Sequence, residues 1–281
     1  MKVLTVNKLT TSVGAEVVGI DPDQLAADDV LGEAVLDALE DNGVLVFPEL
    51  HLDPEAQVRF CQRLGAVDYS SDGHHRIPGI YPITLDVSKN SSAAYLRGTF
   101  AWHIDGCTPT GDECPQKATV LSAVQVADRG GETEFASSYA AYDTLSQEEK
   151  QRFSSLRVVH SLEASQRRVT PDPSPEVLAR WRARRTHEHP LVWTHDSGRK
   201  SLVLGASADY VVGMALDEGR ALLAELLERA TVPDKVYSHR WSVGDTVMWD
   251  NRGVLHRAAA YDPDSPREML RTTVLGDEPI R

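Results

Sequence analysis

Apolar runs of strand length recur along the whole chain, and they limit its fold more than any other feature. They cover residues 3–6, 15–20, 44–47, 117–127, 236–241, 245–249 and 267–275. Short runs that end in Gly, Pro, Asn, Asp or Ser are typical of β-strands, and the first two flank a turn as a hairpin would. Many strands beside a few helices predict a mostly β protein with flanking helices, folded as a double-sheet jelly roll.

Four helices are predicted around these strands. Residues 28–42 begin at Asp and end at Asn-Gly, and residues 53–54 supply an N-cap Asp followed by a first-turn Pro. Residues 146–153 begin with the Ser and Glu spacing of a capping box. Residues 216–229 carry leucines on one face, which indicates an amphipathic helix.

Two longer segments, residues 66–101 and 164–190, lack a sustained period. We expect them to be irregular, lid-like insertions, because the first lies directly upstream of the metal candidate described below. No internal repeat or low-complexity linker divides the chain. Residues 1–281 are therefore predicted to form a single domain.

The charge balance is acidic, since 29 Lys and Arg stand against 42 Asp and Glu for a formal net charge of −13 at pH 7. Such a chain is not expected to bind nucleic acid or an anionic membrane surface. Cys61, Cys107 and Cys114 lack CxxC spacing, which argues against a disulfide framework or structural zinc. Because no signal-peptide core and no bilayer-spanning run is found, we expect a cytoplasmic protein.

His103 and Asp105 are the first candidate metal ligands. On an extended strand, residues i and i+2 project from one face about 7 Å apart, so both side chains can reach one ion. Gly106 then lets the backbone turn away. A second His-x-Asp pair, at 51 and 53, is explained by the helix start at 53. Two imidazoles and one carboxylate can hold one face of Fe(II) and leave the other positions open, so a second histidine is needed.

His256 is the candidate for that histidine, although it can also be read as a polar loop residue bonded to backbone. Arg267 and Arg271 follow it, and period two places both on one face of a strand. If Leu270 faced the core instead, these arginines would be solvated charges. The Gly-Gly-Glu-Thr run at 130–133 is either a hairpin end or the source of a hydroxyl that helps Arg267 bind an anion.

Together, these residues resemble the taurine dioxygenase / 2,4-dichlorophenoxyacetate dioxygenase family of Fe(II)- and 2-oxoglutarate-dependent oxygenases. The matching stretches occur in family order and span nearly the whole chain. They are residues 14–17, 102–105, 130–133, 189–192, 194–195, 249–252, 256, 267, 271 and 275–277. The resemblance implies a distorted double-stranded β-helix core of the jelly-roll, cupin-like type.

The resemblance also implies the roles of the site residues. His103, Asp105 and His256 would bind Fe(II), and Thr133 and Arg267 would grip the distal carboxylate of 2-oxoglutarate. The implied reaction uses O2 to oxidise an unactivated C–H bond, with release of succinate and CO2. The planar fork of arginine suits a carboxylate better than the point charge of lysine.

Arg271 indicates the substrate class, because in related members an arginine at this place binds a sulfonate, sulfate or carboxylate. Thr99 and Thr108 align with substrate contacts of the taurine enzyme, as do Ser70, Leu162 and Ala208, and all five are smaller or less aromatic here. We therefore expect a roomier, more apolar pocket, suited to a larger alkyl or aryl anion than taurine. Since the family often forms dimers or tetramers, a homo-oligomer is expected, although no stretch identifies its interface.

Three alternatives remain open at this point. A zinc hydrolase would also suit two histidines and an aspartate, but it leaves Thr133 and Arg267 unexplained. A non-catalytic small-anion sensor on the same fold would be free to lose a metal ligand, yet all three are intact. Desaturation or isonitrile formation with the same cofactors depends on how the substrate is oriented, which the sequence does not reveal.

Overall fold

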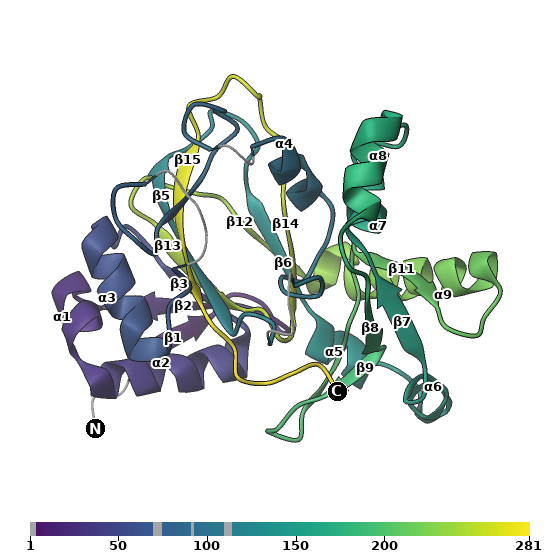
Figure 1. The fold of residues 1–281 in the computed structure, drawn as a ribbon. Helices are drawn as coiled ribbons and strands as arrows, with labels where there is room; N and C mark the ends of the chain where they lie inside the picture. The colour runs from purple at the N-terminus through teal and green to yellow at the C-terminus, as the bar shows by residue number, and fades with distance from the viewer. Residues whose placement is uncertain (1–3, 70–74, 91–92, 110–113) are drawn as a thin grey trace.

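Two β-sheets face each other at the centre of the molecule (Figure 1). The computed structural model describes residues 4–69, 75–90, 93–109 and 114–281. Within these ranges, the larger sheet has seven strands in the order β1-β2-β3-β13-β5-β15-β4, and the facing sheet has three in the order β12-β6-β14. The predicted double-sheet core with flanking helices is therefore confirmed.

The seven predicted runs are present as strands within two residues of their predicted bounds, whereas β6 and β14 were not predicted. The larger sheet contains β1 (Thr5–Lys8), β2 (Ala15–Val18), β3 (Val44–Phe47), β13 (Thr246–Asp250), β5 (Ala118–Gln125), β15 (Glu268–Val274) and β4 (Tyr81–Ile83). The smaller sheet contains β12 (Val236–His239), β6 (Thr133–Ser137) and β14 (Val254–Ala258). The predicted N-terminal hairpin is present as β1 and β2, which pair antiparallel.

Strand β3 shows why its run is apolar throughout. Leu45 and Phe47 pack into a cluster on the outer face of the larger sheet, whereas Val44 and Val46 pack on its inner face with Phe135 of the smaller sheet. Successive side chains of a strand point to opposite faces, so a strand covered on both faces must be apolar at every position. The inner cluster joins the two sheets.

Helices cover the outer face of the larger sheet. They are α1 (Pro22–Ala27), α2 (Asp29–Asn42) and α3 (Pro54–Leu64). The side chain of Asp53 accepts a hydrogen bond from the Ala56 amide, and Pro54 occupies the first turn of α3, as predicted. Helix α1 was not predicted, although Asp21 caps it in the same way and Pro22 begins it.

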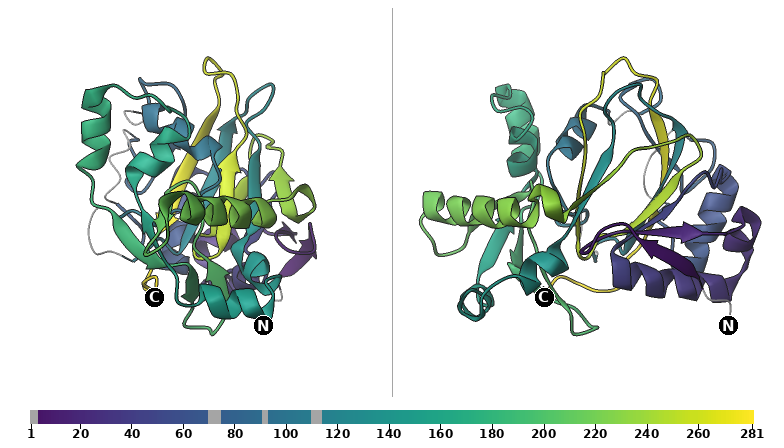
Figure 2. Two further views of the ribbon diagram at one scale, coloured as in Figure 1. Left: turned by 90° about the vertical axis from the view of Figure 1, so that its right-hand side faces the viewer. Right: turned by 180° about the vertical axis from the view of Figure 1, so that it is seen from behind.

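A second layer, built from residues 138–235, packs on the other side of the smaller sheet (Figure 2). Its helices are α5 (Ser138–Asp143), α6 (Gln147–Phe153), α7 (Leu162–Arg167), α8 (Pro175–Arg182) and α9 (Leu216–Ala230), with the one-turn η2 (Pro233–Lys235) at its end. Its strands are β7 (Arg157–His160), β8 (His187–Pro190), β9 (Val192–Thr194), β10 (Lys200–Leu202) and β11 (Ala208–Val211). The predicted helices at 146–153, with its capping box, and at 216–229 are confirmed.

The expectation that residues 164–190 are irregular is wrong. Ser174 caps α8 and Pro175 opens it, while β8 pairs antiparallel with β7. The signal for α8 was local and was overlooked, whereas β8 reads His-Glu-His-Pro and has no apolar pattern of its own. None of the helices in the described ranges is long and apolar enough to cross a membrane.

The first expected insertion, residues 66–101, is only partly regular. It contributes β4 at the edge of the larger sheet, then α4 (Ala93–Leu96) and the 3-10 helix η1 (Arg97–Phe100), with residues 70–74 and 91–92 outside the described ranges. Contacts between η1 and β14 bring this segment over the smaller sheet.

Candidate active site

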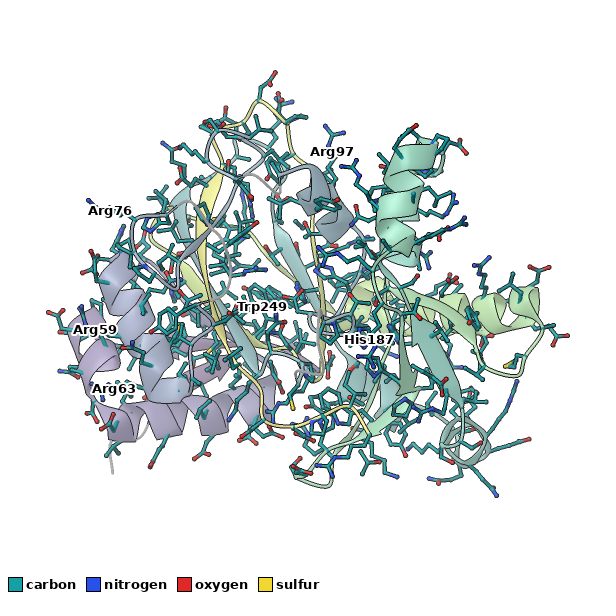
Figure 3. The ribbon with its side chains drawn as sticks, viewed as in Figure 1. Arg59, Arg63, Arg76, Arg97, His187 and Trp249 are labelled. Atoms are coloured by element: carbon teal, nitrogen blue, oxygen red, sulfur yellow. The ribbon has the colours of Figure 1, made fainter. Side chains whose placement is uncertain are left out.

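A pocket lies between the two sheets, beneath α4 and η1. Trp249, one of its lining residues, lies in the interior of the molecule (Figure 3). The residues that line the pocket are Ile83, Leu96, Thr99, Phe100, His103, Asp105, Leu121, Thr133, Trp249, His256, Ala258, Tyr261, Arg267 and Arg271. Seven of the predicted site residues are therefore brought to one place: Thr99, His103, Asp105, Thr133, His256, Arg267 and Arg271.

His103, Asp105 and His256 form a compact cluster whose ligand atoms all lie within 4.8 Å of one another. The Nε2 atom of each histidine is 3.7 Å from an oxygen of Asp105. The two histidines also exchange backbone hydrogen bonds, of 3.0 and 2.9 Å, in an isolated β-bridge. Backbone pairing thus fixes the spacing of the two imidazoles.

The local backbone differs from the prediction on both sides of this cluster. His103 and Asp105 do not lie on a strand: His103 makes only the bridge, and Asp105 begins a turn in which Gly106 has φ +84. His256 lies on β14 rather than in a loop. A Cβ at Gly106 would lie 2.7 Å from the Pro115 backbone, so this turn requires glycine.

The protonation of the cluster suits a divalent metal. The Ala101 carbonyl accepts from Nδ1 of His103 at 2.9 Å, so Nδ1 carries the proton and the lone pair of Nε2 faces Asp105. Burial, reinforced by His103, lowers the pKa of His256 to about 3 and keeps it neutral. Burial alone would raise the pKa of Asp105, but its electrostatic coupling to His256, His103 and Arg271 holds that pKa below the usual value. Two imidazoles and one carboxylate are a donor set that fits Fe(II).

Two arginines face the same pocket without an acidic partner. Arg267 is 2% exposed, donates to the Gly131 carbonyl at 3.2 Å and lies 4.9 Å over the Tyr261 ring. Arg271 lies 5.0 Å over the Tyr81 ring. Among the described residues, neither guanidinium forms an ion pair with a carboxylate, and the Nε of each is buried and unpaired. Burial lowers the pKa of Arg267, but the group remains cationic.

Arg267 and Arg271 both face the pocket, as predicted, but they do not belong to one regular strand. Arg267 precedes β15, and a bulge separates Glu268 from Met269 in its pairing with β5. Beyond the bulge, Arg271 pairs with Leu121, and both line the pocket. A bulge turns the direction of the flanking side chains, which strict period-two counting does not include.

The two threonines expected to contact substrate are separated. Thr99 lines the pocket from η1, and its hydroxyl donates to the Leu96 carbonyl at 2.6 Å. Thr108 and Leu162 instead line a different cavity, and Ala208 lines a third. Ser70, the fifth aligned position, lies outside the described residues.

Aromatic residues of the site were missed from the sequence. Tyr261 packs edge-on against Phe100 with ring centroids 6.0 Å apart, and both line the pocket. Tyr81 lies under Arg271, and Trp241 donates to Thr133 at 3.0 Å. Tyr261 had one usable signal, its place between His256 and Arg267.

Two facing sheets that hold two histidines, an aspartate and a buried arginine at one pocket define a jelly-roll oxygenase that depends on 2-oxoglutarate. The model of the family described as "Taurine catabolism dioxygenase TauD, TfdA family" matches residues 5–273, and the chain belongs to this family. The protein is thus a 2-oxoglutarate-dependent dioxygenase of the taurine dioxygenase-like type, as predicted. Membership implies use of 2-oxoglutarate and iron.

The sequence aligns with individual relatives over most of their length. The chain is 38% identical over 253 residues to an alpha-ketoglutarate-dependent 2,4-dichlorophenoxyacetate dioxygenase from Cupriavidus pinatubonensis, with 85% of this chain and 86% of the relative covered. It is 31% identical over 290 residues to an alpha-ketoglutarate-dependent sulfate ester dioxygenase from Pseudomonas putida, with 99% and 91% covered. The crystal structure of AAD-2 in complex with Mn(II) and N-oxalylglycine superposes with a TM-score of 0.83 at 32% identity, with 99% of both chains covered.

Proposed function

We propose that this protein uses Fe(II), 2-oxoglutarate and O2 to oxidise an unactivated C–H bond of a small anionic substrate, with release of succinate and CO2. The substrate carries a sulfonate, sulfate ester or carboxylate. One observation carries this proposal: Arg267 and Arg271 line the same pocket as the His-Asp-His cluster and lack an acidic partner among the described residues. A buried cation without a carboxylate partner is costly, so the buried Arg267 is kept to bind an anion, and the half-buried Arg271 offers a second cationic group in the same pocket.

His103, Asp105 and His256 would hold the iron. Fe(II) held there would supply the redox centre for the reaction of 2-oxoglutarate with O2. The protein contributes a fixed geometry, because the two histidine backbones are hydrogen-bonded to each other and the Ala101 carbonyl orients the His103 ring. Asp105 contributes the negative charge that offsets the metal.

Thr133 and Arg267 would bind the distal carboxylate of 2-oxoglutarate. The guanidinium offers parallel N–H donors to a carboxylate, and burial strengthens that pairing because little water competes. Tyr261 stacks under the guanidinium and limits its movement. This pairing also explains why Arg267 remains charged in the interior without a protein partner.

Arg271 would bind the anionic group of the primary substrate. Ile83, Leu96, Phe100 and Leu121 line the same pocket and suit an apolar alkyl or aryl body. The names of the relatives, a phenoxyacetate dioxygenase and a sulfate ester dioxygenase, agree with an apolar body joined to an anionic head. We therefore favour an aryloxy or alkyl anion over taurine, and we assign α4 and η1 as the lid over this end of the pocket.

An anaerobic titration tests the cofactor assignment. Fe(II) and then 2-oxoglutarate are added to purified protein, and the weak visible charge-transfer band of the chelate is recorded. We expect the band in the wild type, its loss in His256→Ala, and a higher half-saturating 2-oxoglutarate concentration in Arg267→Ala. Absence of the band in wild type at saturating 2-oxoglutarate would refute the assignment.

The substrate assignment is tested separately by succinate release from a panel of alkyl and aryl sulfonates, sulfate esters and carboxylates. With any active member, Arg271→Ala should raise KM about tenfold to 100-fold and leave more 2-oxoglutarate turnover uncoupled from substrate oxidation, because a charge-assisted pair is lost. Unchanged KM and coupling in Arg271→Ala would show that this arginine does not bind the substrate.

A further inference from the structure

Thr133 is held by a second residue that lies outside the pocket. The indole Nε1 of Trp241 donates to the Thr133 hydroxyl at 3.0 Å, and the exposed fractions of the two residues are only 8% and 4%. Trp241 does not line the pocket that contains the His-Asp-His cluster. It lines a separate cavity behind it, together with Arg240 and the 126–132 turn, and Arg267 forms the wall shared by the two cavities.

The direction of this hydrogen bond follows from chemistry. An indole N–H can only donate, so the Thr133 oxygen must accept from Trp241. No acceptor for the proton of the Thr133 hydroxyl is found among the residues that the structure describes. The proton is therefore left to point into the pocket beside Arg267, where an anion would accept it.

Trp241 is itself fixed from behind. His239 packs edge-on against the indole, with ring centroids 4.5 Å apart at 89°. The imidazole lies between the Tyr237 hydroxyl, 3.0 Å from Nδ1, and Asp245, 3.2 Å from Nε2. Asp245 in turn accepts from the Glu49 and Ser242 amides. The indole donor is thus held in place before any ligand arrives, which is the condition for preorganised binding.

We infer that Trp241 is a positioning residue for 2-oxoglutarate: it fixes the Thr133 hydroxyl as a donor to the distal carboxylate. The inference rests on the proposed roles of Thr133 and Arg267. Accepting from Trp241 also polarises the Thr133 O–H and strengthens its donation to a carboxylate. Without the indole N–H, the hydroxyl is free to rotate and to donate elsewhere.

A double-mutant cycle on co-substrate affinity tests this coupling. Binding of 2-oxoglutarate to the Mn(II)-loaded protein is measured anaerobically by calorimetry, without turnover. Trp241→Phe keeps the aromatic packing and removes the donor, and we expect it to weaken binding about fivefold to tenfold. Thr133→Val should weaken binding by a similar or larger factor, and Trp241→Phe should have almost no further effect in that background.

Trp193→Phe is the matched control, because the Trp193 indole is equally buried but its Nε1 has no hydrogen-bond partner among the described residues. It should leave affinity unchanged. If Trp241→Phe weakened binding equally with and without the Thr133 hydroxyl, its effect would be general packing and the inference would be overturned. Full affinity in Trp241→Phe would overturn it too.

These outcomes are distinct from failure of the proposed function, which would show as no 2-oxoglutarate binding by wild type or as full affinity in Thr133→Val.

A second readout is the NMR spectrum of 15N-labelled indoles, with diamagnetic Zn(II) in place of Mn(II). The Trp241 N–H resonance should shift downfield when 2-oxoglutarate binds to wild type but not to Thr133→Val. An unshifted Trp241 resonance in wild type saturated with 2-oxoglutarate would contradict the inferred chain of hydrogen bonds from Trp241 through Thr133 to the carboxylate.

Discussion

Replacing Arg267 by methionine should stabilise the ligand-free protein while it destroys co-substrate binding. A buried, unpaired guanidinium costs several kcal/mol of desolvation. Its hydrogen bond to Gly131 and its contact with Tyr261 return about 2–4 kcal/mol together. Methionine fills similar space without that cost. We therefore expect the free energy of unfolding of the metal-free protein to rise by about 1 kcal/mol, or about 2–4 °C in Tm.

Calorimetry of wild type and Arg267→Met, with and without Mn(II) and 2-oxoglutarate, measures both effects. Loss of a desolvated charge pair should weaken co-substrate binding by about 100-fold or more. Only the wild type should then gain Tm from added 2-oxoglutarate, since a ligand stabilises the state that binds it. Arg267→Met should therefore have the higher Tm without 2-oxoglutarate, and the wild type should have the higher Tm at high 2-oxoglutarate concentration.

Arg229→Met serves as the control, because Arg229 forms an exposed pair with Glu149. Arg229→Met should lower the free energy of unfolding by less than about 1 kcal/mol and leave co-substrate binding intact. A ligand-free Arg267→Met that unfolded more easily than wild type would refute the reasoning. In that case a group of the protein would stabilise the Arg267 guanidinium in the absence of ligand.

Three further predictions address other parts of the chain. Gly131→Ala should weaken 2-oxoglutarate binding about tenfold by calorimetry, because Gly131 has φ +76 and a Cβ there would lie 3.0 Å from Nε of Arg267; normal affinity would exclude this contact. Burial lowers the pKa of His160 from 6.5 to about 3. Below about pH 6.5 the unfolded chain therefore binds a proton that the folded protein excludes. The free energy of unfolding should be highest above that pH and fall by up to about 1.4 kcal/mol per pH unit towards pH 3. Urea unfolding between pH 7 and 4 should show His160→Phe losing this slope, and an unaltered slope would remove His160 as its source. Thr108→Val should leave KM for an active substrate unchanged, because Thr108 lines a different cavity, and a raised KM would place that cavity on the substrate path.

Local signals explain what the sequence predicted well. The Asp53-Pro54 start of α3 and the capping box at the start of α6 are satisfied within one turn of helix, so nearby residues suffice to predict them. The apolar run of β3 is equally informative, since a strand buried on both faces admits only one kind of residue. His103 and Asp105 were found from spacing and type, although the reason given, an extended strand, was wrong.

Tertiary context explains what could not be predicted from sequence. Strand β8 is polar at three of four positions and exists only because β7 pairs with it. The burial of Arg267 depends on Gly131 and Tyr261, which are brought to it from other segments. Trp241 carried no signal at all, because its importance lies in one hydrogen bond across the smaller sheet.

The bridge between His103 and His256 sets the order in which a working enzyme can mature. The two histidines come from distant parts of the chain, and backbone hydrogen bonds that involve no side-chain atom join them. The ligand pair therefore arises as a by-product of sheet assembly and does not need metal as a folding template. On the proposed function, folding and metal binding are therefore separable steps, and loss of iron would leave the fold in place.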